Sequence, residues 1–74
     1  MHDTLISGLF LKSSYIKVDS MEDISYYFDT ETKDFVRFEF TGEEYWVDII
    51  TPVKDKVDYD ILLNCYMSKV KEYL

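Results

Sequence analysis

Two segments that alternate between apolar and polar residues flank Gly42, and this pair constrains the fold more than any other feature. Gly42 can adopt the positive φ that the first central position of a type II′ turn requires. If Gly42 and Glu43 form the loop, Arg37 faces Asp48 and every apolar residue of 36–40 faces an apolar residue of 45–49. The sequence therefore predicts a β-hairpin in which these residues form one apolar face: Val36, Phe38, Phe40, Tyr45, Val47 and Ile49.

Regular elements are also expected on both sides of this hairpin. Ile24, Tyr26 and Phe28 alternate like a further strand, and residues 30–33 supply a polar loop between that strand and the hairpin. Pro52 should end the sheet, and residues 53–57 should connect it to a helix from an Asp58 N-cap to about Tyr73. The predicted core stripe of this helix is Tyr59, Leu62, Leu63, Tyr66, Met67, Val70, Tyr73 and Leu74, with Ile61 and Cys65 on its opposite side.

The N-terminal region carries a weaker pattern. Apolar residues with helical spacing predict a helix over residues 3–13, with Asp3 as N-cap, although Gly8 leaves a strand over residues 9–18 open. Residues 14–23 fit either an extension of this helix or a short strand. We expect a single α+β domain over residues 1–74: N-terminal helix, three-stranded antiparallel β-meander and C-terminal helix, with both helices packed on the sheet face that contains Tyr26, Phe28 and the apolar face of the hairpin.

Charge limits the kinds of partner. The net charge is −7, and residues 19–51 hold ten acidic and two basic residues, which gives −8 for that segment. An anionic surface disfavours direct binding to nucleic acid or to an anionic membrane, so we expect a neutral or basic protein partner. No apolar run reaches the length of a membrane span, and the single cysteine excludes an intramolecular disulfide, so a cytoplasmic location is expected.

Few residues suit catalysis or metal binding. The only histidine, His2, lies beside the first residue, and Cys65 has no sequence neighbour that would lower its pKa. The acidic residues in 29–34 are spaced as in the first half of a calcium-binding loop, but Asp34 occupies the position at which that loop requires glycine. We therefore expect no enzyme activity, no metal and no cofactor.

The sheet face away from the helices is the expected binding surface. It should combine aromatic anchors with acids that attract a basic partner, unless residues 14–23 or the N-terminal helix fold over it and bury Trp46. The candidate partner-binding residues are Tyr27, Asp29, Glu31, Asp34, Phe35, Glu39, Glu43, Glu44, Trp46 and Asp48, and the candidate self-association residues are Ile61 and Cys65.

Composition and charge together suggest a biological setting. The chain has no alanine, no glutamine and one arginine against seven lysines, as expected from an AT-rich gene of a low-GC bacterium or its phage. The acidic helix–meander–helix layout resembles that of some phage anti-CRISPR and other anti-defence proteins, without any shared motif. This resemblance implies an inhibitor that acts in the host cytoplasm and occupies the basic nucleic-acid-binding surface of a host enzyme. Such an inhibitor is a nucleic-acid mimic, because its negative charge replaces that of the nucleic acid. The alternatives are a homodimeric structural or regulatory subunit without activity, and a carboxylate-dependent enzyme or cation-binding domain.

Overall fold

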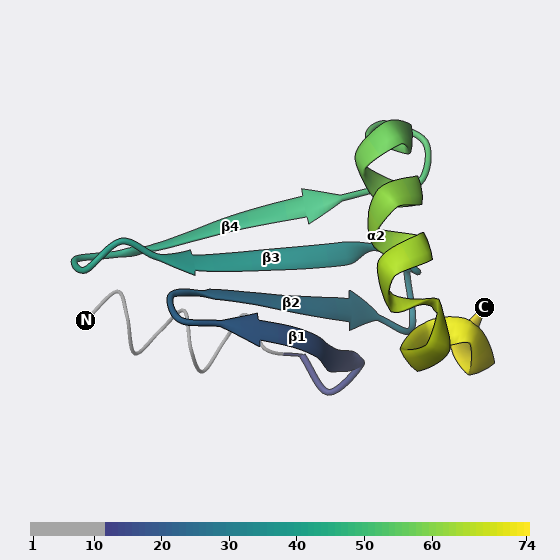
Figure 1. Cartoon of the computed structure of the whole chain (residues 1–74), viewed down its shortest axis with the longest axis horizontal. Helices are drawn as coiled ribbons and strands as arrows, with labels where there is room; N and C mark the ends of the chain where they lie inside the picture. The colour runs from purple at the N-terminus through teal and green to yellow at the C-terminus, as the bar shows by residue number, and fades with distance from the viewer. Residues whose placement is uncertain (1–11) are drawn as a thin grey trace.

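The computed structural model describes residues 12–74, which form an antiparallel four-stranded sheet followed by one helix (Figure 1). The elements are β1 (Tyr15–Met21), β2 (Ile24–Asp29), β3 (Phe35–Phe40), β4 (Tyr45–Ile50), α2 (Lys56–Val70) and the short 3-10 helix η1 (Lys71–Tyr73). The strands lie in chain order, β1-β2-β3-β4. The α+β class is confirmed. The predicted helix over residues 3–13 lies outside the described residues, apart from positions 12 and 13, which are not helical.

The predicted number of three strands is wrong, because residues 15–21 form β1. Ile16 and Val18 are β-branched, which favours the pleated backbone, and Val18 is fully buried. A bulge interrupts the pairing with β2 between Lys17 and Asp19, so the apolar side chains of β1 do not follow a simple alternation. Because of this bulge, the sequence of β1 lacks the alternation of apolar and polar residues that identifies a strand.

The predicted β3–β4 hairpin is confirmed in its full register. Phe40 pairs with Tyr45, and the ladder continues with Arg37 opposite Asp48 and Val36 opposite Ile49. Gly42 has a φ of 100°, the positive value expected for it. Thr41 N–H donates to the Glu44 carbonyl at 2.9 Å and closes the turn.

The predicted assignment of the sheet faces is wrong for β3 and β4. Phe28 of β2 pairs with Phe35 of β3, so Phe35 shares the face of Phe28, and Val36 lies on the opposite face. The side chains of the α2 face pack on the helix through Phe28, Phe35 and Ile50. The residues predicted to pack on the helix but found on the opposite face are Val36, Phe38, Phe40, Tyr45, Val47 and Ile49.

The core between sheet and helix is centred on Phe35. Its ring lies 5.1 Å from that of Phe28 and 5.2 Å from that of Tyr59, and all three side chains are buried. The predicted stripe of α2 is confirmed at Tyr59 and Val70, and Leu62, Leu63, Tyr66 and Tyr73 pack partly buried against the same cluster. Met67 is 36% exposed and Leu74 is 59% exposed, which contradicts their prediction as core.

The helix begins earlier than predicted, with Asp55 as N-cap rather than Asp58. The Asp55 carboxylate accepts a hydrogen bond from Thr51 N–H at 3.2 Å, which shapes the turn after Pro52. Ile61 and Cys65 are exposed, as predicted. Within residues 12–74, no helix combines the length and apolarity needed to cross a membrane.

The helix covers only part of the sheet. α2 crosses one end, where β2 and β4 finish, whereas the β3–β4 turn projects at the other end (Figure 1). The α2 face therefore has a covered half, which holds the core, and an open half toward the hairpin tip.

Candidate functional site

The open half of the α2 face brings together five of the predicted partner-binding residues. We call this region the acidic hairpin surface and define it as Glu39 of β3, Trp46 and Asp48 of β4, and Glu43 and Glu44 of the connecting turn. Trp46 is 56% exposed and lies directly opposite Glu39 across the ladder. The prediction that Trp46 is exposed on the sheet is confirmed, but it lies on the face that α2 partly covers.

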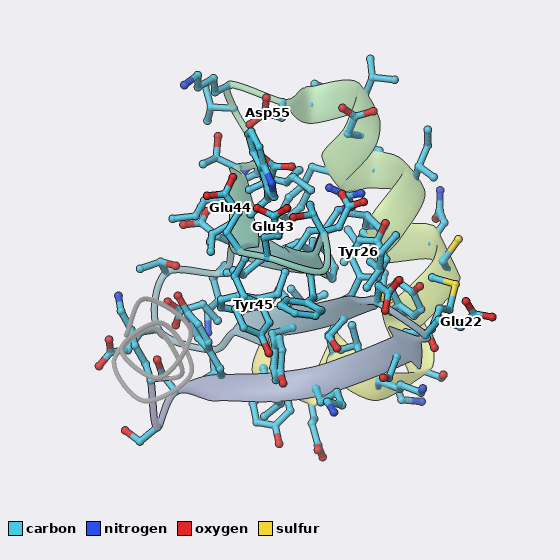
Figure 2. All side chains as sticks on the ribbon, turned by 90° about the vertical axis from the view of Figure 1, so that its left-hand side faces the viewer. Glu22, Tyr26, Glu43, Glu44, Tyr45 and Asp55 are labelled. Carbon is cyan, nitrogen blue, oxygen red and sulfur yellow. The ribbon has the colours of Figure 1, made fainter. Side chains whose placement is uncertain are left out.

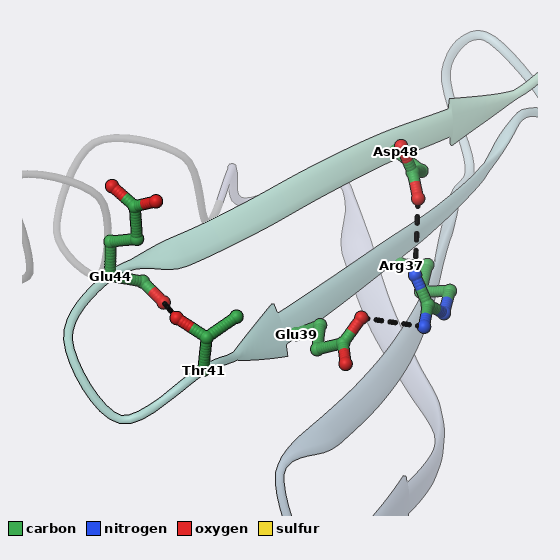
Figure 3. A network of polar contacts seen from close by, with 5 residues as sticks. All are labelled: Arg37, Glu39, Thr41, Glu44 and Asp48. Atoms are coloured by element: carbon green, nitrogen blue, oxygen red, sulfur yellow. Dashed lines mark hydrogen bonds and ion pairs between the residues drawn. The ribbon is translucent and has the colours of Figure 1, made fainter.

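Arg37 organises the carboxylates of this surface. Its Nη2 donates to Glu39 Oε1 at 2.8 Å, and its Nη1 donates to Asp48 Oδ2 at 3.1 Å (Figure 3). Burial disfavours the guanidinium charge, but hydrogen bonding to Glu39 outweighs it and raises the pKa of Arg37 above its usual value. Arg37 is thus a permanent clamp that holds two carboxylates in place, and the three side chains together carry a net charge of −1.

Glu43 and Glu44 add two further charges at the tip. Figure 2 views the sheet from this end, with both glutamates at the turn. Both are exposed, and the Thr41 hydroxyl donates to the Glu44 carbonyl at 3.2 Å, which leaves the Glu44 carboxylate uninvolved in this contact. The turn fixes the backbone while the charged side chains extend into solvent.

Two predicted site residues are instead part of the fold. Phe35 is fully buried in the core, and Asp29 is 3% exposed. The Asp29 carboxylate accepts hydrogen bonds from Glu31 N–H at 2.9 Å and Thr32 N–H at 3.4 Å, so it orders the β2–β3 loop. The prediction that both are accessible to a partner is wrong.

The remaining predicted residues lie elsewhere on the molecule. Tyr27 is half-buried on the opposite face, where its ring meets Phe38 edge-on at 5.4 Å. Glu31 and Asp34 belong to the β2–β3 loop, at the end of the sheet that α2 covers. The structure therefore splits the single predicted surface into three regions.

A groove next to the acidic hairpin surface was not anticipated from the sequence. It has a volume of about 520 Å³ and lies between α2 and the middle of the sheet. Tyr26, Arg37 and Asp48 form its floor side, and Asp58 and Leu62 of α2 form the helix side. The groove could be predicted only from the correct register of β2 against β3, because that register places Tyr26 next to Arg37.

Across residues 12–74, no group of three or more His, Cys, Asp or Glu side chains is arranged to hold a metal ion. Cys65 is exposed on α2, one turn from Ile61, and the groove is lined by neither cysteine nor histidine.

Comparisons with known proteins add no assignment. No family model, no curated protein and no solved structure matches this chain.

Proposed function

We propose that this protein is a small, non-catalytic interaction module whose acidic hairpin surface binds a basic surface of another protein. One observation carries the proposal: Trp46 is 56% exposed on a paired strand and lies between Glu39 and Asp48, which Arg37 holds in position. Tryptophan is highly buried on average in folded proteins, and it is among the residues most enriched at the energetic centres of interfaces.

The charges around Trp46 suit a partner rich in lysine and arginine. Glu43 and Glu44 at the tip raise the encounter rate with a basic partner, whereas Trp46 provides apolar contact once the two proteins meet. A nucleic-acid-binding groove is a basic surface of this kind, because its lysine and arginine side chains normally contact phosphates. Carboxylates on a rigid sheet can bind the same lysine and arginine side chains in place of phosphates.

The proposed biological setting follows from composition. An AT-rich coding sequence, small size and strong acidity suit a phage or mobile-element inhibitor of anti-defence or anti-CRISPR type, acting on a nucleic-acid-binding enzyme in the host cytoplasm. This setting is part of the proposal and makes no use of a cofactor, a membrane or direct binding to nucleic acid.

The test is binding kinetics against a partner isolated from host lysate with the tagged protein, at low and at raised salt. Trp46→Ala should weaken binding by more than about 2 kcal/mol, mainly through faster dissociation. Glu43→Lys with Glu44→Lys should slow association and reduce its salt dependence, because exposed rim charges act on encounter.

A matched control changes the same net charge elsewhere. Glu31→Lys with Glu72→Lys alters two exposed glutamates outside the acidic hairpin surface, so it should leave the salt dependence much closer to that of the wild type. Circular dichroism checks that every variant is folded. Equal effects of the two double variants would mean that net charge alone drives binding, and the acidic hairpin surface would then have no specific role.

The second candidate function, a homodimeric structural or regulatory subunit, is favoured by a different observation. β4 is an edge strand with exposed apolar side chains on both of its faces. The next subsection develops this observation, which does not depend on the acidic hairpin surface binding a basic partner.

A further inference from the structure

The two edges of the sheet differ in how they are protected. β1 and β4 are the edge strands among residues 12–74, and each presents backbone N–H and C=O groups that have no neighbouring strand in this part of the chain. In β4 these groups belong to Tyr45, Val47 and Ile49. This follows from the hydrogen-bonded pair of Thr41 with Glu44, because bonding pairs alternate along an antiparallel ladder and Trp46 and Asp48 therefore direct theirs toward β3.

The β1 edge carries several features that discourage pairing. A bulge breaks its register between Lys17 and Asp19. The Val18 carbonyl accepts a hydrogen bond from Lys69 Nζ at 2.6 Å, and Asp19 Oδ2 accepts one from the Tyr66 hydroxyl at 2.8 Å. Bulges, edge lysines and covering elements are the usual means by which proteins prevent edge-to-edge association.

Within the described part of the chain, the β4 edge has none of these protections. It is a regular six-residue strand, Tyr45–Ile50, without proline, lysine or a bulge in its pairing with β3. Trp46 on one face and Ile49 on the other are each 56% exposed, and Asp48 is the only charged residue of the strand. A regular, apolar edge of this length is a template for another strand.

We propose that β4 pairs with β4 of a second copy, antiparallel and centred on Val47, to form a continuous eight-stranded sheet. The occupant is a second copy because the strand is complementary to itself in this register. Val47 faces Val47 of the second copy, Tyr45 faces Ile49, and Trp46 faces Asp48, so no two like charges lie opposite each other.

Neighbouring registers are less favourable. Centring the pair on Trp46 places Glu44 opposite Asp48 of the second copy, and centring it on Asp48 places the two Asp48 side chains opposite each other. In the Val47 register, the hairpin tip of each copy also reaches the end of β4 in the other, where Lys54 is exposed. Glu44 then lies opposite Ile50, and Glu43 lies opposite Thr51, so neither is directly opposite an acidic residue.

Cysteine cross-linking tests both the interface and its register, in a Cys65→Ser background. Cα atoms of an opposed bonded pair are about 5.5 Å apart, within the range of a disulfide, so Val47→Cys should form a covalent dimer under mild oxidation. Ile49→Cys is the matched control: its two copies would be offset by four residues, about 14 Å, too far for a disulfide. Equal cross-linking of the two variants, or of neither, would overturn the proposed register.

The oligomeric state provides an independent measurement. The wild type should change from monomer to dimer with concentration in sedimentation velocity, and Val47→Pro should remain monomeric because proline removes an outward N–H that β3 does not use. Circular dichroism checks that this variant keeps its fold, and Val47→Thr should still dimerise. A wild type that stays monomeric up to millimolar concentration would refute the proposed dimer and would leave the effect of Trp46→Ala on partner binding unaffected. If instead the wild type dimerises but Trp46→Ala has no effect on partner binding, only the proposed function is refuted.

Discussion

Asp29 shows how a residue that looks like part of a binding surface can serve the fold instead. Its side chain belongs to the end of β2, and its carboxylate holds two backbone N–H groups of the following loop. Burial by itself would raise the pKa of this carboxyl, but the hydrogen bonds from Glu31 and Thr32 outweigh burial and lower it below the usual value. The charged form is thus the one that the folded protein stabilises.

This assignment predicts an acid-dependent loss of stability. Because the pKa of Asp29 is lower in the folded than in the unfolded state, its contribution is complete at neutral pH and is lost as the pH falls below about 4. Asp29→Asn should be less stable than the wild type at pH 7 by about 1–3 kcal/mol, and the difference should shrink toward pH 3. Urea unfolding at several pH values measures both quantities. A constant difference across this range would contradict the role given to the carboxylate.

At the scale of elements, the contact between α2 and β1 joins the end of the chain to the first described strand. The Tyr66 hydroxyl donates to Asp19, and its ring lies 6.1 Å from that of Tyr26. Tyr66 has non-helical backbone angles, φ −116° and ψ 18°, which mark a kink in α2 at this contact. Burial, reinforced by the hydrogen bond to Asp19, raises the pKa of Tyr66 to about 12.

The raised pKa predicts an alkaline weakening of this contact. In the unfolded chain a tyrosine ionises near pH 10, whereas in the folded protein Tyr66 stays neutral to about pH 12, so stability falls as the pH rises through this interval. Tyr66→Phe should lower stability at pH 7 and flatten the decline above pH 10. Tyr45→Phe, in β4, serves as the control and should keep the wild-type decline, as measured by urea unfolding. Identical alkaline profiles for Tyr66→Phe and the wild type would exclude this contact as the cause.

The sequence was informative where apolar alternation and a turn residue agreed. The hairpin around Gly42 could be predicted in full because one loop length matched every apolar residue of β3 with one of β4. The same count across the expected loop of residues 30–33 places Phe28 opposite Phe35, as the structure does, whereas the prediction placed Phe28 on the face of Val36. Val36, Phe38 and Phe40 make one face of β3 entirely apolar, whereas the other face combines Phe35 with Arg37 and Glu39, so apolar content favoured the face that does not pack on α2.

The pattern of apolar and polar residues could not predict the bulge in β1 or the position of α2. The bulge in β1 disrupts alternation, and the position of α2 at one end of the sheet depends on tertiary packing around Phe35. Of the predicted site, the adjacent residues of the hairpin stayed together because a single turn connects them. The predicted site residues of β2 and of the β2–β3 loop lie elsewhere, because their positions depend on the register of β2 against β3, which was predicted wrongly.

For the molecule as a whole, stability should depend more on the end of the sheet that α2 covers than on the hairpin tip. Phe35 is fully buried between Phe28 and Tyr59, whereas Phe40 is half-buried near the hairpin tip and packs against Tyr45 with ring centres 4.9 Å apart. The layer between sheet and helix thus depends on Phe35 more than on any residue of the tip.

We expect Phe35→Ala to cost about 3–5 kcal/mol, which approaches the total stability of a domain of this size. Phe40→Ala should cost less and leave a cooperative unfolding transition. Thermal melts followed by circular dichroism compare the two variants, with Trp46→Ala as an exposed control expected within about 1 kcal/mol of the wild type. The reverse order, with Phe40→Ala the more damaging, would contradict the core described above.

The four-residue loop between Asp29 and Asp34 also determines which changes in length the gene can tolerate during evolution. A change in length that the loop absorbs keeps Phe28 opposite Phe35 and leaves both faces of the sheet as they are. A change that instead shifts the pairing of β2 with β3 by one residue would exchange Phe35 for Val36 beneath α2 and move Trp46 to the other side of the molecule. Tolerated changes in this loop should therefore be those that preserve the pairing of Phe28 with Phe35.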